Sequence, residues 1–250
     1  VEQGRPSIHH ERPMMRQALK ATLTHLNLPT SLGHELRIEF DSTIPVAKGM
    51  ASSTADISAT IVATARHFNQ TIDEPLIATI ASSLEATDST MFRSLTLFRH
   101  QLGEVVRSYS WQPNINILLL ESDTTLTTSL FHQRHDHDLK TLSQQYHPTR
   151  KRLESAMQQQ CTSQLGIATT MSATFSQAVI PKPEWATLLK IVEQCDLLGL
   201  NVAHSGTIVG LLYHEAKHDI DRVVAEIKRR KVTTHYPHYH QVTMVMGGVR

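Results

Sequence analysis

The stretch IPVAKGMASSTADISAT, from Ile44 to Thr60, places a lysine, a glycine and two serines directly before an expected helix. The first turn of a helix has unpaired N–H groups and roughly half a positive charge, so it can hold an anion. Gly49 can adopt a positive φ that lets backbone amides approach a ligand, and Lys48 adds a cation. Ser52 and Ser53 can offer hydroxyls to a phosphate or a metal ion. This stretch therefore predicts the binding of a phosphorylated ligand.

Other interpretations of the same residues stay open at this point. The lysine precedes the glycine, so the stretch is not a P-loop, in which Gly-Lys is followed by Ser or Thr. Small residues with Ser or Thr before an apolar stripe are also the ordinary residues of a helix cap. Asp56, in the first helical turn, either favours the helix dipole or contacts a metal ion or water.

The elements that must position this loop follow from hydrophobic spacing. Helical periodicity predicts a helix over 12–27, and the alternation in HELRIEF, residues 34–40, predicts a half-buried strand. Further helices are expected over 57–68, 73–85, 150–178, 184–198 and 220–227, and further strands over 115–122, 207–213 and 242–246. This mixture predicts an α+β fold with two layers.

Composition narrows the class of protein. The chain has 250 residues and 40% hydrophobic content, enough for one large domain or two modest ones. A net charge of +1 argues against nucleic acid or a membrane surface as the main partner, and no apolar run is long enough to span a membrane. Cys161 and Cys195 show no metal spacing, so we expect buried thiols in a reducing cytoplasm. The polar, His-rich segment 124–149 is the expected domain boundary.

The whole loop pattern is more specific than its parts. Pro45-x-x-x-Gly49-Met50-Ala51-Ser52-Ser53-Thr54-Ala55, between a strand and a helix, resembles the phosphate loop of the GHMP kinase superfamily. Met50 stands where leucine is common, and Ala51 stands where glycine is common. Residues 83–101 and 201–213 are similar to the branch of L-threonine kinases that serve cobalamin (coenzyme B12) synthesis. The resemblance covers about residues 11–249.

This resemblance implies a two-lobed GHMP kinase fold of the α+β class, with ATP and substrate between the lobes. The ribosomal-protein-S5-like N-terminal lobe would span 1–135, and the ferredoxin-like C-terminal lobe would span 136–250. The implied activity is the ATP- and Mg²⁺-dependent phosphorylation of L-threonine to O-phospho-L-threonine in the cytoplasm. A homoserine kinase, another GHMP small-molecule kinase and a non-catalytic ligand-binding relative remain alternatives. The family's first motif has no counterpart here, so we expect the N-terminal part of the pattern to be missing.

The resemblance also implies roles for particular residues. The implied cofactor-binding residues are Pro45, Val46, Ala47, Lys48, Gly49, Met50, Ala51, Ser52, Ser53, Thr54 and Ala55. Ser53 and Glu85 are the implied Mg²⁺ ligands, because a hard cation prefers oxygen. Asp88 would take the proton from the acceptor hydroxyl. Glu85 and Asp88 are closer in sequence than is usual in the family, so a solvated helix end and a turn remain their alternative roles.

Three further groups of residues complete the expectation. His204-Ser205-Gly206 corresponds to the family's glycine-rich third motif, which borders the phosphate or substrate site, whereas Gly210 is expected to serve strand packing. His204 either hydrogen-bonds the substrate or is a structural histidine. Arg93 is the expected partner of the substrate carboxylate. Two histidine groups, His132, His135 and His137 and then His235, His238 and His240, lack zinc-type spacing and predict solvated loops rather than a metal site.

Overall fold

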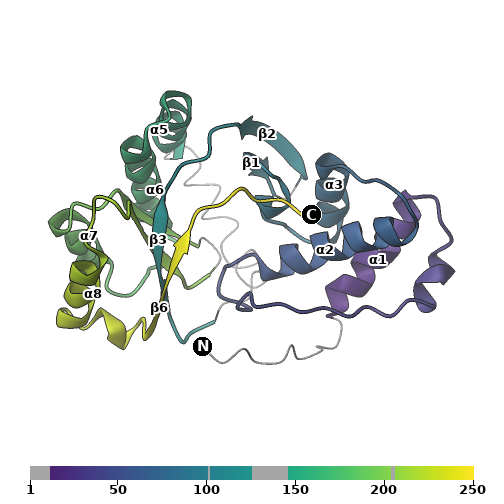
Figure 1. Ribbon diagram of the computed structural model, residues 1–250, viewed down its shortest axis with the longest axis horizontal. Coiled ribbons are helices and arrows are strands. Elements are labelled where there is room, and N and C mark those ends of the chain that lie inside the picture. Colours follow the sequence, from purple (N-terminus) through teal and green to yellow (C-terminus); the bar gives the residue numbers. More distant parts are fainter. Residues whose placement is uncertain (1–11, 101, 126–145, 204–205) are drawn as a thin grey trace. The chain divides into compact units, whose positions relative to one another are not determined.

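The computed structural model describes residues 12–100, 102–125, 146–203 and 206–250 (Figure 1). Its contacts divide the chain into two compact units, which are described separately. The first comprises Val1–Pro45, Ala51–Gln112 and Met246–Arg250, and the second comprises Val46–Met50 and Pro113–Val245. The boundary at Gln112–Pro113 precedes the expected one at 135/136, because strand β3 (Asn116–Glu121) pairs with strands of the second unit. The assignment of the family's lobes to 1–135 and 136–250 stays a prediction.

The first unit is built on helices α1 (Pro13–His25), α2 (Ser52–His67) and α3 (Glu74–Leu84), which pack against one another. Helix α3 begins as predicted, with Pro75 in its first turn and the Asp73 side chain accepting the Leu76 N–H at 2.9 Å. The apolar stripes of the three helices meet in one core. Its fully buried members include Ala18, Ile57, Ile61, Ala78 and Ile80.

The segment HELRIEF alternates as expected but forms no ladder. Leu36, Ile38 and Phe40 are half-buried, and Arg37 and Glu39 between them are exposed. Within the described part of the chain, Phe40 alone of these residues forms a bridge, so the predicted strand over 34–40 is wrong. The physical reason is that a strand needs backbone hydrogen bonds to a neighbour, which side-chain alternation alone does not supply; residues 36–40 instead line a groove of about 270 Å³ with side chains of α1 and α2.

A hairpin of β1 (Leu95–Arg99) and β2 (Glu104–Tyr109) was not predicted. The two strands are antiparallel, with a bulge between Leu97 and Phe98. Most residues of β2 are exposed, so the sequence carries little of the alternation that marks a half-buried strand. The 3₁₀ turn η2 (Ser89–Met91) precedes this hairpin and links it to α3.

The second unit contains an antiparallel sheet of order β4-β5-β3-β6, formed by β4 (Gly199–Val202), β5 (Val209–Tyr213), β3 and β6 (His238–Thr243). The predicted strand over 242–246 begins earlier and ends earlier than expected. The reason is register: Thr243 lies opposite Asn116, the first residue of β3, so the ladder stops there. Gly210 packs as predicted, because a Cβ there would lie 2.2 Å from the Asn201 side-chain oxygen.

Helices cover this sheet. They are α5 (Tyr146–Gln159), α6 (Thr162–Ser176), α7 (Trp185–Gln194) and α8 (Ile220–Arg229) (Figure 1). The core joins Leu118 and Leu120 of β3 to Leu188 of α7 and Val223 and Ile227 of α8. Helix α6 contacts β4 closely: a Cβ on Gly166 would lie 1.9 Å from the Leu198 carbonyl oxygen.

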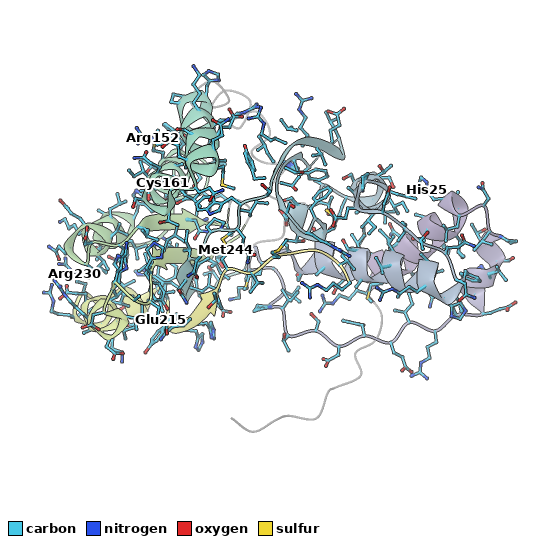
Figure 2. The ribbon with its side chains drawn as sticks, turned by 45° about the horizontal axis from the view of Figure 1, so that its top comes forward. His25, Arg152, Cys161, Glu215, Arg230 and Met244 are labelled. Carbon is cyan, nitrogen blue, oxygen red and sulfur yellow. The ribbon has the colours of Figure 1, made fainter. Side chains whose placement is uncertain are left out.

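Both cysteines are free thiols. Cys161 lies between α5 and α6 (Figure 2) and Cys195 ends α7; each is half-buried rather than buried as expected. Among the helices described, none has both the length and the apolar character needed to cross a membrane.

Candidate active site

The loop before α2 has an unusual backbone. Ala47, Gly49 and Ala51 have φ angles of 58°, 86° and 56°, so every second residue is left-handed. Left-handed residues are one component of the backbone nests that bind anions in other proteins. Ala51 is the N-cap of α2, with φ 56° and ψ 31°, and the described residues show no side-chain cap hydrogen bond there. Simple Ser/Thr capping is therefore not what the structure shows.

Gly49 is fixed against the third predicted motif. A Cβ on Gly49 would lie 2.8 Å from the Gly206 Cα, and a Cβ on Gly206 would lie 2.2 Å from the Lys48 carbonyl oxygen. The Thr207 N–H donates to that same carbonyl at 3.1 Å. The two glycine motifs, far apart in sequence, thus lie backbone to backbone in the second unit. His204 and Ser205, predicted with Gly206, lie outside the described residues.

The Lys48 side chain lies at the end of strand β3. Its ammonium donates to the carbonyl oxygens of Ser122 and Thr124, the latter at 3.2 Å, and lies 3.6 Å from a Glu121 carboxylate oxygen. These groups follow the end of β3 or belong to it. The side chain therefore ties the loop to the sheet, and a contact of Lys48 with phosphate stays a prediction.

The first turn of α2 carries the hydroxyl residues. Ser53 is half-buried, whereas Ser52 and Thr54 are buried. Asp56, one turn further, forms an ion pair with Arg12, which lies just before α1. Burial raises the pKa of Asp56, and the neighbouring guanidinium offsets this only in part. Asp56 is therefore the ion-pair partner of Arg12. Sequence reasoning missed Arg12 because the two residues are 44 positions apart.

Glu85 and Asp88 flank the segment that follows α3. Glu85 is the C-cap of α3 and is half-buried, and Asp88 is exposed and precedes the 3₁₀ turn η2. The Thr54 hydroxyl oxygen accepts the Asp88 N–H at 3.0 Å and the Thr87 hydroxyl at 2.9 Å. The structure therefore joins the predicted catalytic residue to the first turn of α2.

Arg93 lies on another part of the first unit. Its Nε is 3.6 Å from a Glu74 carboxylate oxygen, and its backbone N–H donates to the same atom at 3.1 Å. It lines a groove of about 400 Å³ together with Asp73, Val249 and others, none of which is a predicted site residue. The structure thus does not bring Arg93 together with the predicted site residues, and its contact with a substrate carboxylate stays a prediction.

Histidines form no metal site in the described part of the chain. Of the two groups, His132, His135 and His137 lie outside the described residues. His235, His238 and His240 each face one carboxylate, those of Glu184, Asp123 and Glu121. Among the residues that the structure describes, no group of three His, Cys, Asp or Glu side chains could hold a metal ion.

Lys182 is a buried residue that sequence reasoning missed. It is 5% exposed, and its ammonium donates to the Gly206 carbonyl oxygen at 2.7 Å. Burial lowers its pKa to about 8. Lys182 lies between Pro181 and Pro183, and this local sequence carries no signal of its burial.

Comparisons with known proteins identify the class. The family model "GHMP kinases N terminal domain" matches residues 14–92. The L-threonine kinase of Citrobacter freundii is 42% identical over 250 residues, which cover 100% of this chain and 86% of that protein. The L-threonine kinase of Salmonella typhimurium is 43% identical over 249 residues, covering 98% of this chain and 82% of that protein. The chain belongs to the GHMP kinases and is a small-molecule kinase.

Solved structures confirm the fold. The homoserine kinase of Cytophaga hutchinsonii is similar with a TM-score of 0.65 and 14% identity, covering 96% of this chain and 79% of that one. Lactococcus lactis galactokinase complexed with galactose is similar with a TM-score of 0.67 and 9% identity, covering 99% of this chain and 78% of that one. Streptococcus pneumoniae phosphomevalonate kinase in complex with phosphomevalonate and AMPPNP is similar with a TM-score of 0.64 and 13% identity, covering 93% of this chain and 83% of that one. The predicted α+β GHMP kinase fold is confirmed, and ATP is the phosphoryl donor that membership of this family supports.

Proposed function

We propose that this chain transfers the γ-phosphoryl group of ATP to the hydroxyl of L-threonine, giving O-phospho-L-threonine and ADP. The observation that carries the proposal is the 42% identity with the L-threonine kinase of Citrobacter freundii over 250 residues. As the resemblance implies, we further propose that the reaction occurs in the cytoplasm and that its product serves cobalamin synthesis.

The triphosphate is proposed to lie on the backbone N–H groups from Gly49 to Ser53. Two features support this assignment: the left-handed residues Gly49 and Ala51, and the absence, among the described residues, of a side-chain cap at the start of α2. Unpaired amides and the helix dipole stabilise negative charge. Lys182 and Lys48 contribute indirectly, since both ammonium groups hold backbone carbonyls near this loop.

The donor chemistry of two residues suits a Mg²⁺ ion that the nucleotide also helps to hold. Ser53 offers a hydroxyl oxygen and Glu85 a carboxylate, and both side chains are half-buried. Mg²⁺ prefers oxygen ligands and usually takes one or two from the protein, with phosphates and waters supplying the others. The ion would neutralise phosphate charge during transfer. Ser53 and Glu85 are the proposed protein ligands.

Asp88 is the proposed general base. The threonine hydroxyl oxygen forms a bond to the γ-phosphorus, and the bond from that phosphorus to the β,γ-bridging oxygen breaks, releasing ADP. The hydroxyl proton passes to the Asp88 carboxylate. Positioning and charge stabilisation supply most of the catalysis in phosphoryl transfer, so the fixed backbone of Asp88 supports this role.

The decisive experiment compares acceptors. ADP release is measured with ATP, Mg²⁺ and either L-threonine, L-homoserine or L-serine, and the phosphorylated product is identified by mass spectrometry. We expect L-threonine to give the highest kcat/KM by about 10-fold or more, since a methyl group or a shifted hydroxyl changes pocket fit by a few kcal/mol. A clear preference for homoserine would replace the proposed substrate. No transfer to any amino acid would leave a ligand-binding relative as the better description.

A further inference from the structure

One buried hydroxyl joins the two parts of the proposed active site that come from different elements. Thr54 is 2% exposed and lies in the first turn of α2, next to Ser53. Its oxygen accepts two hydrogen bonds, from the Thr87 hydroxyl at 2.9 Å and from the Asp88 N–H at 3.0 Å. Both donors belong to the segment between α3 and η2, which is 33 and 34 residues further along the chain.

These two bonds occupy the acceptor capacity of the hydroxyl. A threonine oxygen has two lone pairs and one O–H, so two incoming donors leave only the proton for other contacts. Thr54 was expected to bind the cofactor with the rest of the loop. Its acceptor sites face the Asp88 segment, which gives this side chain a role that the loop motif does not reveal.

We propose that Thr54 is a positioning residue, which fixes the backbone of Asp88 against the first turn of α2. This inference rests on the proposed function, in which that turn holds the triphosphate and Asp88 takes the proton. A single side chain would then set the separation between the nucleotide and the base. Phosphoryl transfer needs such alignment, because a misplacement of about 1 Å can lower the rate by about 10²-fold.

The other end of the same segment is also held. Met91 and Phe92 are buried in the core of the first unit. The Thr90 carbonyl oxygen accepts the N–H of Gly248 at 3.1 Å. At the Asp88 end, the Thr54 oxygen accepts the Asp88 N–H, and the Thr87 N–H donates to the His100 carbonyl oxygen at 3.4 Å. Loss of the Thr54 oxygen should therefore displace Asp88 without unfolding the segment.

The test is a set of valine and serine substitutions assayed for threonine phosphorylation. Thr54→Val keeps the shape and removes the acceptor, and we expect kcat to fall by about 10- to 10²-fold with little change in KM for ATP. Thr54→Ser restores the oxygen and should recover most of the lost kcat. Thr64→Val is the matched control: Thr64 is buried on the same helix, and its hydroxyl donates to the Thr60 carbonyl at 2.7 Å.

A double-mutant comparison separates positioning from a general structural effect. In an Asp88→Asn background, Thr54→Val should cause no further loss, because the group that it positions is already absent. An equal loss in both backgrounds would overturn the proposal, as would an unchanged kcat for Thr54→Val. If Thr54→Val does not fold, Thr87→Val removes one of the two donors and should show the same dependence on Asp88. Wild-type protein that phosphorylates no amino acid would contradict the proposed function before this comparison begins.

Discussion

At the scale of single residues, Asp88 combines an exposed side chain with a backbone held by Thr54. A base for proton abstraction needs this combination, because its carboxylate must meet the substrate while its position stays fixed. Asp88→Asn is nearly isosteric and removes the basic oxygen. We expect kcat to fall by about 10²-fold or more, with ATP affinity changed by less than about 3-fold.

Steady-state kinetics and nucleotide titration measure these two quantities for Asp88→Asn. The control is Asp73→Asn, at the N-cap of α3, which should leave both stability and kcat nearly intact, because asparagine caps a helix about as well as aspartate. Unchanged turnover in Asp88→Asn would remove Asp88 from the mechanism.

Two charged residues near the loop have interaction partners that their sequence positions do not indicate. Lys48 looks like a phosphate ligand in sequence, but carbonyl oxygens beyond β3 satisfy its ammonium. Asp56 looks like a dipole or metal residue, but Arg12 pairs with it. A half-buried charge takes the partners that the fold brings near, because an unpaired charge away from water is costly.

At the scale of elements, the start of α2 depends on left-handed backbone at Gly49 and Ala51. Alanine reaches this region only with strain of about 1 kcal/mol. Ala51→Gly should therefore leave the free energy of unfolding unchanged or raise it by up to ~1 kcal/mol. Gly49→Ala should lower it by ~2 kcal/mol or more, because the new Cβ would also lie 2.5 Å from the Ala203 Cβ.

Urea denaturation of both variants checks this contrast, and calorimetric titration with an ATP analogue follows binding. Gly49→Ala should also weaken nucleotide binding, whereas Ala51→Gly should keep it. Equal destabilisation by both substitutions would contradict the assignment of steric contact to Gly49 alone.

At the scale of the whole molecule, Lys182 links stability to pH. Burial lowers its pKa to about 8 from an ordinary 10.5. Between these values the unfolded chain holds a proton that the folded chain has lost, so unfolding takes up a proton. Rising pH therefore disfavours unfolding, and this group should raise the free energy of unfolding by up to ~1.4 kcal/mol per pH unit.

The measurement is urea denaturation of wild type and Lys182→Met at several pH values between 7 and about 10.5. The difference between the two curves isolates Lys182 from other groups that titrate in this range. We expect the wild type to gain stability relative to the variant as pH rises through this window. Parallel curves would show that the ammonium keeps an ordinary pKa in the folded state.

Local patterns in the sequence were sufficient for the helices and for the buried strands β3 and β5, but they did not predict the buried strand β4. The stripe of α2, the Asp73 cap and the apolar run of β3 are properties of consecutive residues, so periodicity and cap chemistry reveal them. Family resemblance identified the class of kinase for the same reason, since the loop motif is contiguous.

Tertiary structure alone decided which distant groups meet. The partners of Lys48, Asp56, Thr54 and Gly206 lie tens of residues away, and no spacing rule connects them. The segment HELRIEF carries strand alternation, yet pairing needs a neighbouring strand that the sequence of this segment cannot specify. Hydrogen bonds and ion pairs act over a few ångströms, so they depend on the folded path of the chain rather than on residue type.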